Sequence, residues 1–228
     1  MHGIIIFSRL SSERLPNKAL VDIGGRTLLQ RVIDRAKLIL PLSQIVVATS
    51  DGRDDQALAD HALGEGVEVF RGSLNNVAER ARDCARYYAF DYFARVCGDR
   101  TFFDPLETKE CFRIIEETSV DIVTNAFEGG CSPGQTTEII KFSAIEKVVA
   151  SALESECKEH MTRYIYNNPT DFKIRNYVSV SKGSTLPLAV DTYEDVERAR
   201  YIVDNAGKDP RYLTFSEISN LANAFKAH

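Results

Sequence analysis

The sequence has few cysteines and histidines, and neither type falls into a metal-binding pattern. The five cysteines are odd in number and include no Cys-x-x-Cys pair, so the sequence indicates neither a disulfide framework nor a zinc site. The four histidines are scattered, with no His-Glu-x-x-His or similar spacing. We therefore expect reduced, mostly structural thiols and no structural zinc.

Long apolar runs and an excess of positive charge are also missing. No apolar run approaches the roughly 20 residues that a helix needs to cross a bilayer, and no basic region precedes the first apolar residues as in a secretory signal. Lys and Arg number 28 against 33 Asp and Glu, a net charge of -5. Such a balance does not favour broad binding to nucleic acid or acidic membranes. We expect a cytoplasmic globular protein with no nucleic-acid partner and no membrane insertion.

The usual nucleotide and hydrolase motifs are absent as well. The chain contains no G-x-x-x-x-G-K-[ST] segment, and Gly24-Gly25 does not belong to a G-x-G-x-x-G pattern. It also has no G-x-S-x-G nucleophile elbow. These absences disfavour a P-loop hydrolase, a dinucleotide-binding Rossmann site and a covalent hydrolase.

In the first half of the chain, short apolar runs alternate with longer amphipathic segments. The runs predicted to be strands are residues 4–7, 45–48, 67–70, 92–97 and 121–125. Apolar residues at helical spacing between and after them begin near residues 29, 57, 77 and 111. This alternation predicts an α/β fold with a mixed, mostly parallel sheet flanked by helices.

The pattern changes after residue 125. A turn-rich stretch at 128–134 precedes a predicted strand at 139–140 and predicted helices at 145–153 and 161–166. Residues 186–190 are predicted to form a strand that returns to the sheet, followed by helices capped at Thr192 and Thr214. We predict one domain over 1–228, with a first part of alternating strands and helices (1–125), an inserted subdomain (126–185) and a returning strand with C-terminal helices (186–228).

A basic loop follows the first predicted strand directly. Residues 8–18 contain Arg9, Arg14 and Lys18 among small residues. Ligands bind outside the carboxyl ends of strands in open α/β sheets, and this mixture of fixed cations suits a polyphosphate. A solvated surface loop is the alternative.

Carboxylates follow two later strands. Asp99 comes directly after Gly98 at the end of the fourth predicted strand, and Asp191 ends the predicted returning strand. One or two carboxylates together with phosphate oxygens and waters complete the coordination of Mg²⁺, so these two residues form a candidate metal pair. The alternative is a helix cap or turn former, the simpler interpretation for Asp191 alone. Asp104 is better placed than Asp99 to cap the next helix.

Several segments together resemble the sugar cytidylyltransferases, especially the spore-coat polysaccharide biosynthesis and acylneuraminate cytidylyltransferase-like branch. Residues 8–18 resemble the triphosphate loop of that family. Further blocks resemble the family in the same order: residues 46–51, 69–73, 98–99 and 190–195. The segment 158–174 is the most distinctive match. The ordered set covers most of the chain.

The resemblance implies a Rossmann-like nucleotidyltransferase fold with a sugar-binding and dimerisation insertion, and a homodimer. It implies Mg²⁺-dependent transfer of CMP from CTP to a 2-keto sugar acid, with pyrophosphate release, for surface polysaccharide synthesis. The implied catalytic residues are Arg9, Lys18 and Asp99, and the implied metal ligands are Asp99 and Asp191. The implied nucleotide-binding residues are Arg9, Ser11, Ser12, Arg14, Lys18, Thr49, Asp51, Arg71, Gly72 and Ser73. The implied sugar-binding residues are Glu138, Glu159 and His160.

Departures from the family pattern keep other hypotheses open. Ser11 and Asn17 stand where the family loop usually has glycine, Glu13 adds a negative charge, and Arg100 follows Asp99. These changes allow a non-catalytic nucleotide-binding scaffold, or a nucleotidyltransferase with another base and an amino sugar. A glycosyltransferase on a similar sheet is a third hypothesis, and a structural role remains the alternative for His160.

Overall fold

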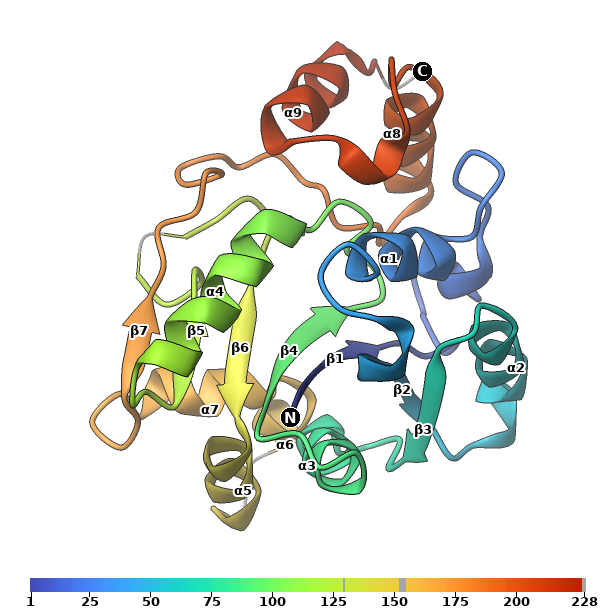
Figure 1. The fold of residues 1–228 in the computed structure, drawn as a ribbon. Helices are drawn as coiled ribbons and strands as arrows, with labels where there is room; N and C mark the ends of the chain where they lie inside the picture. The colour runs from blue at the N-terminus through green and yellow to red at the C-terminus, as the bar shows by residue number, and fades with distance from the viewer. Residues whose placement is uncertain (129, 152–154, 227–228) are drawn as a thin grey trace.

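The computed structural model describes residues 1–128, 130–151 and 155–226, which form a mixed sheet of seven strands (Figure 1). The strands are β1 (His2–Phe7), β2 (Ile45–Ser50), β3 (Glu68–Gly72), β4 (Tyr92–Cys97), β5 (Ile122–Thr124), β6 (Glu138–Lys141) and β7 (Ile174–Asn176). Their order across the sheet is β3-β2-β1-β4-β6-β5-β7. β6 runs antiparallel to β4 and β5, and the other described pairings are parallel. The predicted fold class is confirmed.

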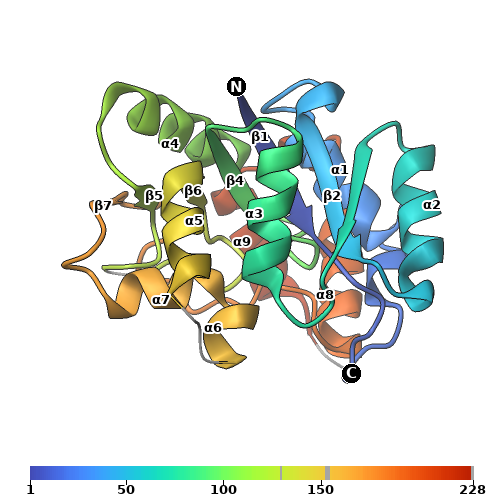
Figure 2. The ribbon, with the colours of Figure 1, turned by 90° about the horizontal axis from the view of Figure 1, so that it is seen from below.

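Helices cover both faces of this sheet. Those on one face are α1 (Leu28–Ala36), α2 (Gln56–Gly64) and α4 (Pro105–Glu117). Those on the other face, nearest the viewer in Figure 2, are α3 (Val77–Tyr87), α5 (Phe142–Ala150), α6 (Ser155–Glu159) and α7 (Met161–Asn167). Short 3-10 helices span Lys18–Leu20, Leu42–Gln44, Arg53–Asp55 and Pro210–Tyr212. No helix within the described ranges is long and apolar enough to span a membrane.

The uninterrupted apolar run of β1 is explained by burial on both faces. Ile4 and Ile6 pack in the core beneath α1 and α4, whereas Ile5 and Phe7 pack in the core beneath α3 and α5. Successive strand side chains point to opposite faces, so a strand covered on both sides carries apolar residues at every position.

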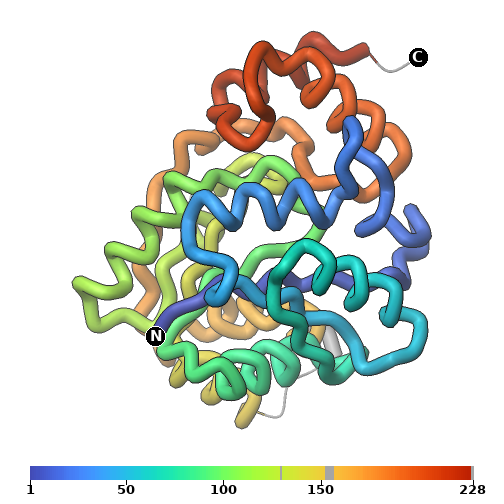
Figure 3. The backbone as a smooth tube through the Cα atoms, turned by 45° about the vertical axis from the view of Figure 1, so that its right-hand side comes forward, coloured from blue at the N-terminus to red at the C-terminus, as the bar shows by residue number. Residues whose placement is uncertain are grey.

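A third layer is formed by α8 (Tyr193–Asp204) and α9 (Phe215–Ala224), which share a core with Leu15, Ile23 and Leu28. Figure 3 shows these C-terminal helices beside the early part of the chain. Arg200 Nε donates a hydrogen bond to the carbonyl of Asp22 at 3.0 Å. The two C-terminal helices therefore pack against the basic loop that follows β1 and the segment after it.

The structure corrects one predicted strand and adds one that was not predicted. Residues 186–190 are not a strand: Val190 N–H donates to the carbonyl of Asp99, and the segment packs under α8 instead of joining the sheet. The sheet ends at β7, whose three residues are too short and polar to stand out as a pattern. The predicted caps of α4, α8 and α9 are confirmed at Asp104, Thr192 and Thr214.

The predicted helix boundaries agree with the structure only in part, and the predicted domain division is not tested by it. α5 ends at Ala150, and α6 was not predicted. Residues 152–153 of the predicted helix, residue 129 of the turn-rich stretch and residues 227–228 lie outside the described residues. β6 and β7 come from the predicted insertion and belong to the same sheet as β1–β5. The three-part division therefore stays a prediction.

The order of the strands places a crevice between β1 and β4. The chain runs outward from β1 through β2 to β3, and β4 then returns to the opposite side of β1. Such a reversal opens a crevice at the carboxyl ends of the two strands. The sequence places Arg9 and Asp99 at those ends, shortly after β1 and β4.

Candidate active site

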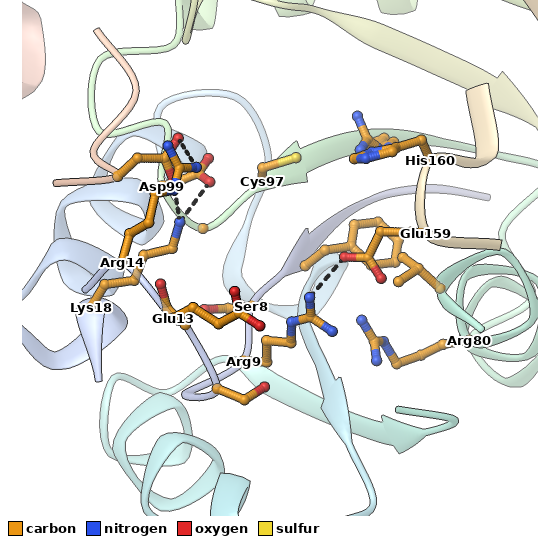
Figure 4. Close-up of a pocket in the computed structure, with 17 residues that line it drawn as sticks. Ser8, Arg9, Glu13, Arg14, Lys18, Arg80, Cys97, Asp99, Glu159 and His160 are labelled. Atoms are coloured by element: carbon orange, nitrogen blue, oxygen red, sulfur yellow. Dashed lines mark hydrogen bonds and ion pairs between the residues drawn. The ribbon is translucent and has the colours of Figure 1, made fainter. Parts of the chain in front are cut away.

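A cavity of about 920 Å³ lies at the carboxyl ends of β1 and β4 (Figure 4). Its walls come from the basic loop after β1, the end of β4, the beginning of α3, the junction of α6 and α7, and Asp191. Segments from the whole length of the chain therefore meet around one hollow.

At one end of the cavity, two carboxylates converge on one ammonium group. Lys18 Nζ lies 3.0 Å from Asp99 Oδ2 and 2.8 Å from Asp191 Oδ1, and Arg14 Nη2 lies 3.1 Å from Asp191 Oδ2. Burial opposes the charged form of Lys18, but Asp99 and Asp191 outweigh it and raise the pKa of Lys18. Burial likewise opposes ionisation of Asp191, but Lys18 and Arg14 outweigh it and lower the pKa of Asp191. Lys18 and Asp191 are therefore both charged near neutral pH.

The conformation of the basic loop directs its cations into the cavity. Leu15 is buried in the core under α8 and anchors the loop between Arg14 and Lys18. Asn17 has a left-handed backbone with φ of 57°, and the 3-10 helix begins at the next residue. Asn adopts this region more readily than most residues, which explains how it stands where the family loop usually has glycine.

A buried aspartate that sequence reasoning missed holds the start of the loop. Asp55 Oδ1 accepts a hydrogen bond from Leu10 N–H at 2.7 Å, and its Oδ2 accepts hydrogen bonds from the backbone and hydroxyl of Ser50. Asp55 is 2% exposed. It joins the end of β2 to the loop after β1, and so fixes the position of Arg9.

The other end of the cavity holds arginines and the α6–α7 junction. Arg9 Nη2 lies 3.0 Å from Glu159 Oε1, and Arg80 and His160 line the same end (Figure 4). Arg95 also lines the cavity and donates from Nη1 to Glu138 Oε2 at 2.6 Å.

Glu138 lies behind Arg95 and does not line the cavity. The Tyr166 hydroxyl donates to Glu138 Oε1 at 2.8 Å. Burial opposes the charged form of Glu138, but Arg95 and Arg100 outweigh burial and lower the pKa of its carboxyl. Glu138 therefore holds Arg95 in place.

The structure brings together nine of the sequence-predicted site residues. Those that line the cavity are Arg9, Ser11, Ser12, Arg14, Lys18, Asp99, Glu159, His160 and Asp191. Those that do not line it are Thr49, Asp51, Arg71, Gly72, Ser73 and Glu138. Their roles in binding nucleotide or sugar stay predictions.

The predicted residues of β2 and β3 are directed elsewhere in this structure. Thr49 is fully buried within β2, and Asp51 is exposed after it. Arg71 donates to the backbone carbonyls of Ser50 and Gly52 at 3.0 and 2.6 Å. Its guanidinium thus stabilises the turn after β2.

Two cavity arginines were missed, although the sequence carried a signal for each. Arg80 shares a face of α3 with the buried Val77 and Cys84, three and four residues away, where a charge is unexpected. Arg95 shares a face of the central strand β4 with Phe93. A charged residue on a buried face points to a functional or ion-paired position.

Comparison with known proteins agrees with the resemblance. The family model described as cytidylyltransferase matches residues 3–215. The spore coat polysaccharide biosynthesis protein SpsF of Bacillus subtilis is 29% identical over 228 residues, covering 96% of this chain and 92% of that protein. The 3-deoxy-manno-octulosonate cytidylyltransferase of Acinetobacter baumannii is 31% identical over 156 residues, covering 66% and 58%.

A solved structure extends the agreement to the fold. A cytidylyltransferase from Leptospira borgpetersenii matches with a TM-score of 0.91 and 26% identity, covering 98% of this chain and 94% of that one. The predicted Rossmann-like nucleotidyltransferase fold is thereby confirmed. The chain belongs to the cytidylyltransferase family and is a nucleotidyltransferase.

Proposed function

We propose that the protein transfers CMP from CTP to a 2-keto sugar acid, with release of pyrophosphate, as a Mg²⁺-dependent cytoplasmic step in surface polysaccharide synthesis. The observation that carries the proposal is the convergence of Asp99 and Asp191 on Lys18 within a cavity rich in arginine. The names of the two relatives support the polysaccharide pathway, the cytidylyl group and an acidic sugar.

The basic loop is suited to the triphosphate. Arg9, Arg14 and Lys18 supply three cations, and the hydroxyls of Ser11 and Ser12 add donors on the same wall. A leaving pyrophosphate carries several negative charges, which fixed cations in a partly enclosed site stabilise strongly.

The donor set fits Mg²⁺. The carboxylate oxygens of Asp99 and Asp191 are held within reach of one shared ammonium group, so they point into the same space. Within the described ranges no group of three or more metal-ligating side chains occurs. In the proposal, Asp99 and Asp191 would hold the ion, and phosphate oxygens and waters would supply its remaining ligands, as Mg²⁺ prefers. When bound, Mg²⁺ would neutralise negative charge on the phosphates.

The reaction needs positioning more than covalent chemistry. A hydroxyl oxygen of the sugar forms a bond to the α-phosphorus, and its proton passes to water. The bond from that phosphorus to the bridging oxygen breaks, and pyrophosphate leaves with the electron pair. The loop cations hold the departing phosphates, so no residue of the chain needs to be covalently modified.

Pyrophosphate release tests the proposal. The assay combines Mg²⁺, each of the four ribonucleoside triphosphates, and a panel of 2-keto sugar acids and amino sugars. We expect release with CTP and one sugar acid, reduced by about 10²- to 10³-fold in Asp99→Asn and Lys18→Gln. Asp60→Asn, an exposed carboxylate on α2, is the matched control and should keep full activity.

Other results would select the alternatives. Binding of a triphosphate without release of pyrophosphate in any combination would favour the scaffold hypothesis. Release with another base and an amino sugar would reassign the substrates, and consumption of a nucleotide sugar would favour a glycosyltransferase. The homodimer and the sugar-binding role of residues 126–185 remain part of the proposal, and light scattering of the full chain tests the former.

A further inference from the structure

Arg80 is a buried cation whose hydrogen-bonding groups are mostly unused. Its side chain lines the cavity although the residue is only 2% exposed. Nη1 donates to the carbonyl of Ser73 at 2.7 Å, and no described residue accepts a hydrogen bond from Nε. Figure 4 shows its guanidinium directed toward the space beside Arg9 and Glu159.

A structural arginine in the same chain looks different. Arg35 is 3% exposed, and all three of its nitrogens donate to backbone carbonyls. Arg35 thus joins α1 to the C-terminal segment and is satisfied within the fold. Arg80 makes one such bond, so holding the backbone does not account for its burial.

The charges around Arg80 leave it without a carboxylate partner. Of the other arginines that face this part of the cavity, Arg9 is paired with Glu159, and Arg95 is paired with Glu138. Glu159 and the buried Asp55 both act electrostatically on Arg80, and Oε1 of Glu159 is bound to Arg9. Within the described part of the chain, no carboxylate forms an ion pair with Arg80, so neither neighbour neutralises its charge by direct contact.

Such an arrangement favours a bound anion. Burying a guanidinium without a partner is unfavourable, and burial lowers the pKa of Arg80. An anion that entered the cavity would offset this cost. The planar guanidinium of an arginine matches the planar fork of a carboxylate.

We propose that Arg80 binds the carboxylate of the acceptor sugar. This inference rests on the proposed function, in which Arg9 reaches the triphosphate from this end and Lys18, Asp99 and Asp191 hold it from the opposite end. That end has its own cations, so the unpaired charge of Arg80 is left for the second substrate. Arg80 is then a specificity-determining residue that selects an acidic sugar over a neutral one.

Calorimetric titration of the full chain tests this. The protein is saturated with the α,β-methylene analogue of CTP, which cannot react, and titrated with 3-deoxy-manno-octulosonate or N-acetylneuraminate. Each acid is compared with its methyl ester. We expect Arg80→Gln to weaken binding of one acid on the order of 10- to 100-fold, and the wild-type protein to bind the ester equally weakly. Arg80→Lys should show an intermediate loss.

Two controls separate recognition from folding and from nucleotide binding. Arg86→Gln removes an arginine from the same helix that is 56% exposed and paired with Glu146, and it should leave acid binding unchanged. The dissociation constant of the CTP analogue should change less than about threefold in Arg80→Gln and Arg80→Lys, which also reports that both variants are folded.

Three results would overturn the inference. One is equal loss of affinity for the CTP analogue and the acid in Arg80→Gln, which would assign Arg80 to the nucleotide. Another is equal binding of acid and ester by the wild-type protein. The third is failure of both acids to bind. Pyrophosphate release with a neutral sugar would then support the transferase function and reject only the carboxylate site. No pyrophosphate release with any acceptor would reject both proposals.

Discussion

Lys18 Nζ lies 2.8 Å from Asp191 Oδ1, although 173 positions separate the two residues. The contact joins the loop after the first strand to the segment that precedes α8, and Asp99 completes it from the end of β4. This ion-paired cluster therefore depends on closure of the C-terminal layer over the N-terminal loop. It links the stability of the fold to the geometry of the site.

The ion pair predicts a defined pH dependence of stability. Burial alone would raise the pKa of Asp191, but Lys18 and Arg14 lower it, so its contribution is present above the unfolded value of about 3.9 and lost as pH falls through the folded value. The pKa of Lys18 is raised despite burial. Its contribution to stability is therefore present below the unfolded pKa of about 10.4 and lost as pH rises through the folded pKa.

Urea titrations of the wild type and Asp191→Asn across the pH range check this. The difference in unfolding free energy should be constant between about pH 5 and pH 9 and shrink toward both extremes. A difference that persists unchanged down to pH 2 would contradict the assignment of the ion pair.

The buried pair of Arg95 and Glu138 predicts a strong asymmetry between single and double substitutions. Their side chains are 10% and 2% exposed. Arg95→Met should cost about 3–5 kcal/mol of unfolding free energy, because it leaves a buried carboxylate without its cation. The double variant Arg95→Met with Glu138→Leu should recover most of that loss, since the Tyr166 hydroxyl keeps its contact with Thr124. Chemical denaturation of the wild type, the single variant and the double variant measures these losses. Equal losses of unfolding free energy in the single and double variants would contradict the prediction.

Gly98 is predicted to be required for the close approach of the loops after β1 and β4. A Cβ at this position would lie 2.7 Å from Ser8 Oγ and 2.8 Å from Ser8 Cβ. Gly98→Ala should therefore cost about 1–3 kcal/mol of stability and weaken triphosphate binding, because Ser8 and Asp99 are pushed apart.

Gly64→Ala is the matched control for this substitution. A Cβ at Gly64, the last residue of α2, meets nothing within 4 Å. Alanine there should be neutral or stabilise by up to about 1 kcal/mol. Thermal unfolding and calorimetric nucleotide binding of both variants distinguish the two positions, and equal effects would show that the close approach is not what matters.

Much of the local structure was predictable because it depends on short-range patterns. The apolar runs of β1, β2, β4 and β5 and the caps at Asp104, Thr192 and Thr214 lie where the sequence indicated. β7 was missed because an edge strand of three residues leaves almost no periodic signal. The sequence predicts a strand at 186–190 because an apolar run packed under helices has the same pattern as one paired in a sheet.

The sequence by itself determined the α/β class, the basic loop at the end of a strand, and the carboxylates Asp99 and Asp191. Each of these features depends on a pattern of residues close together in the chain. Only the tertiary structure decided that Asp191 meets Lys18, that Glu138 lies behind Arg95, and that Arg80 enters the cavity without a carboxylate partner. These relationships depend on the angle and distance between elements far apart in the chain. Burial and packing of the whole core set those distances, so no local pattern records them.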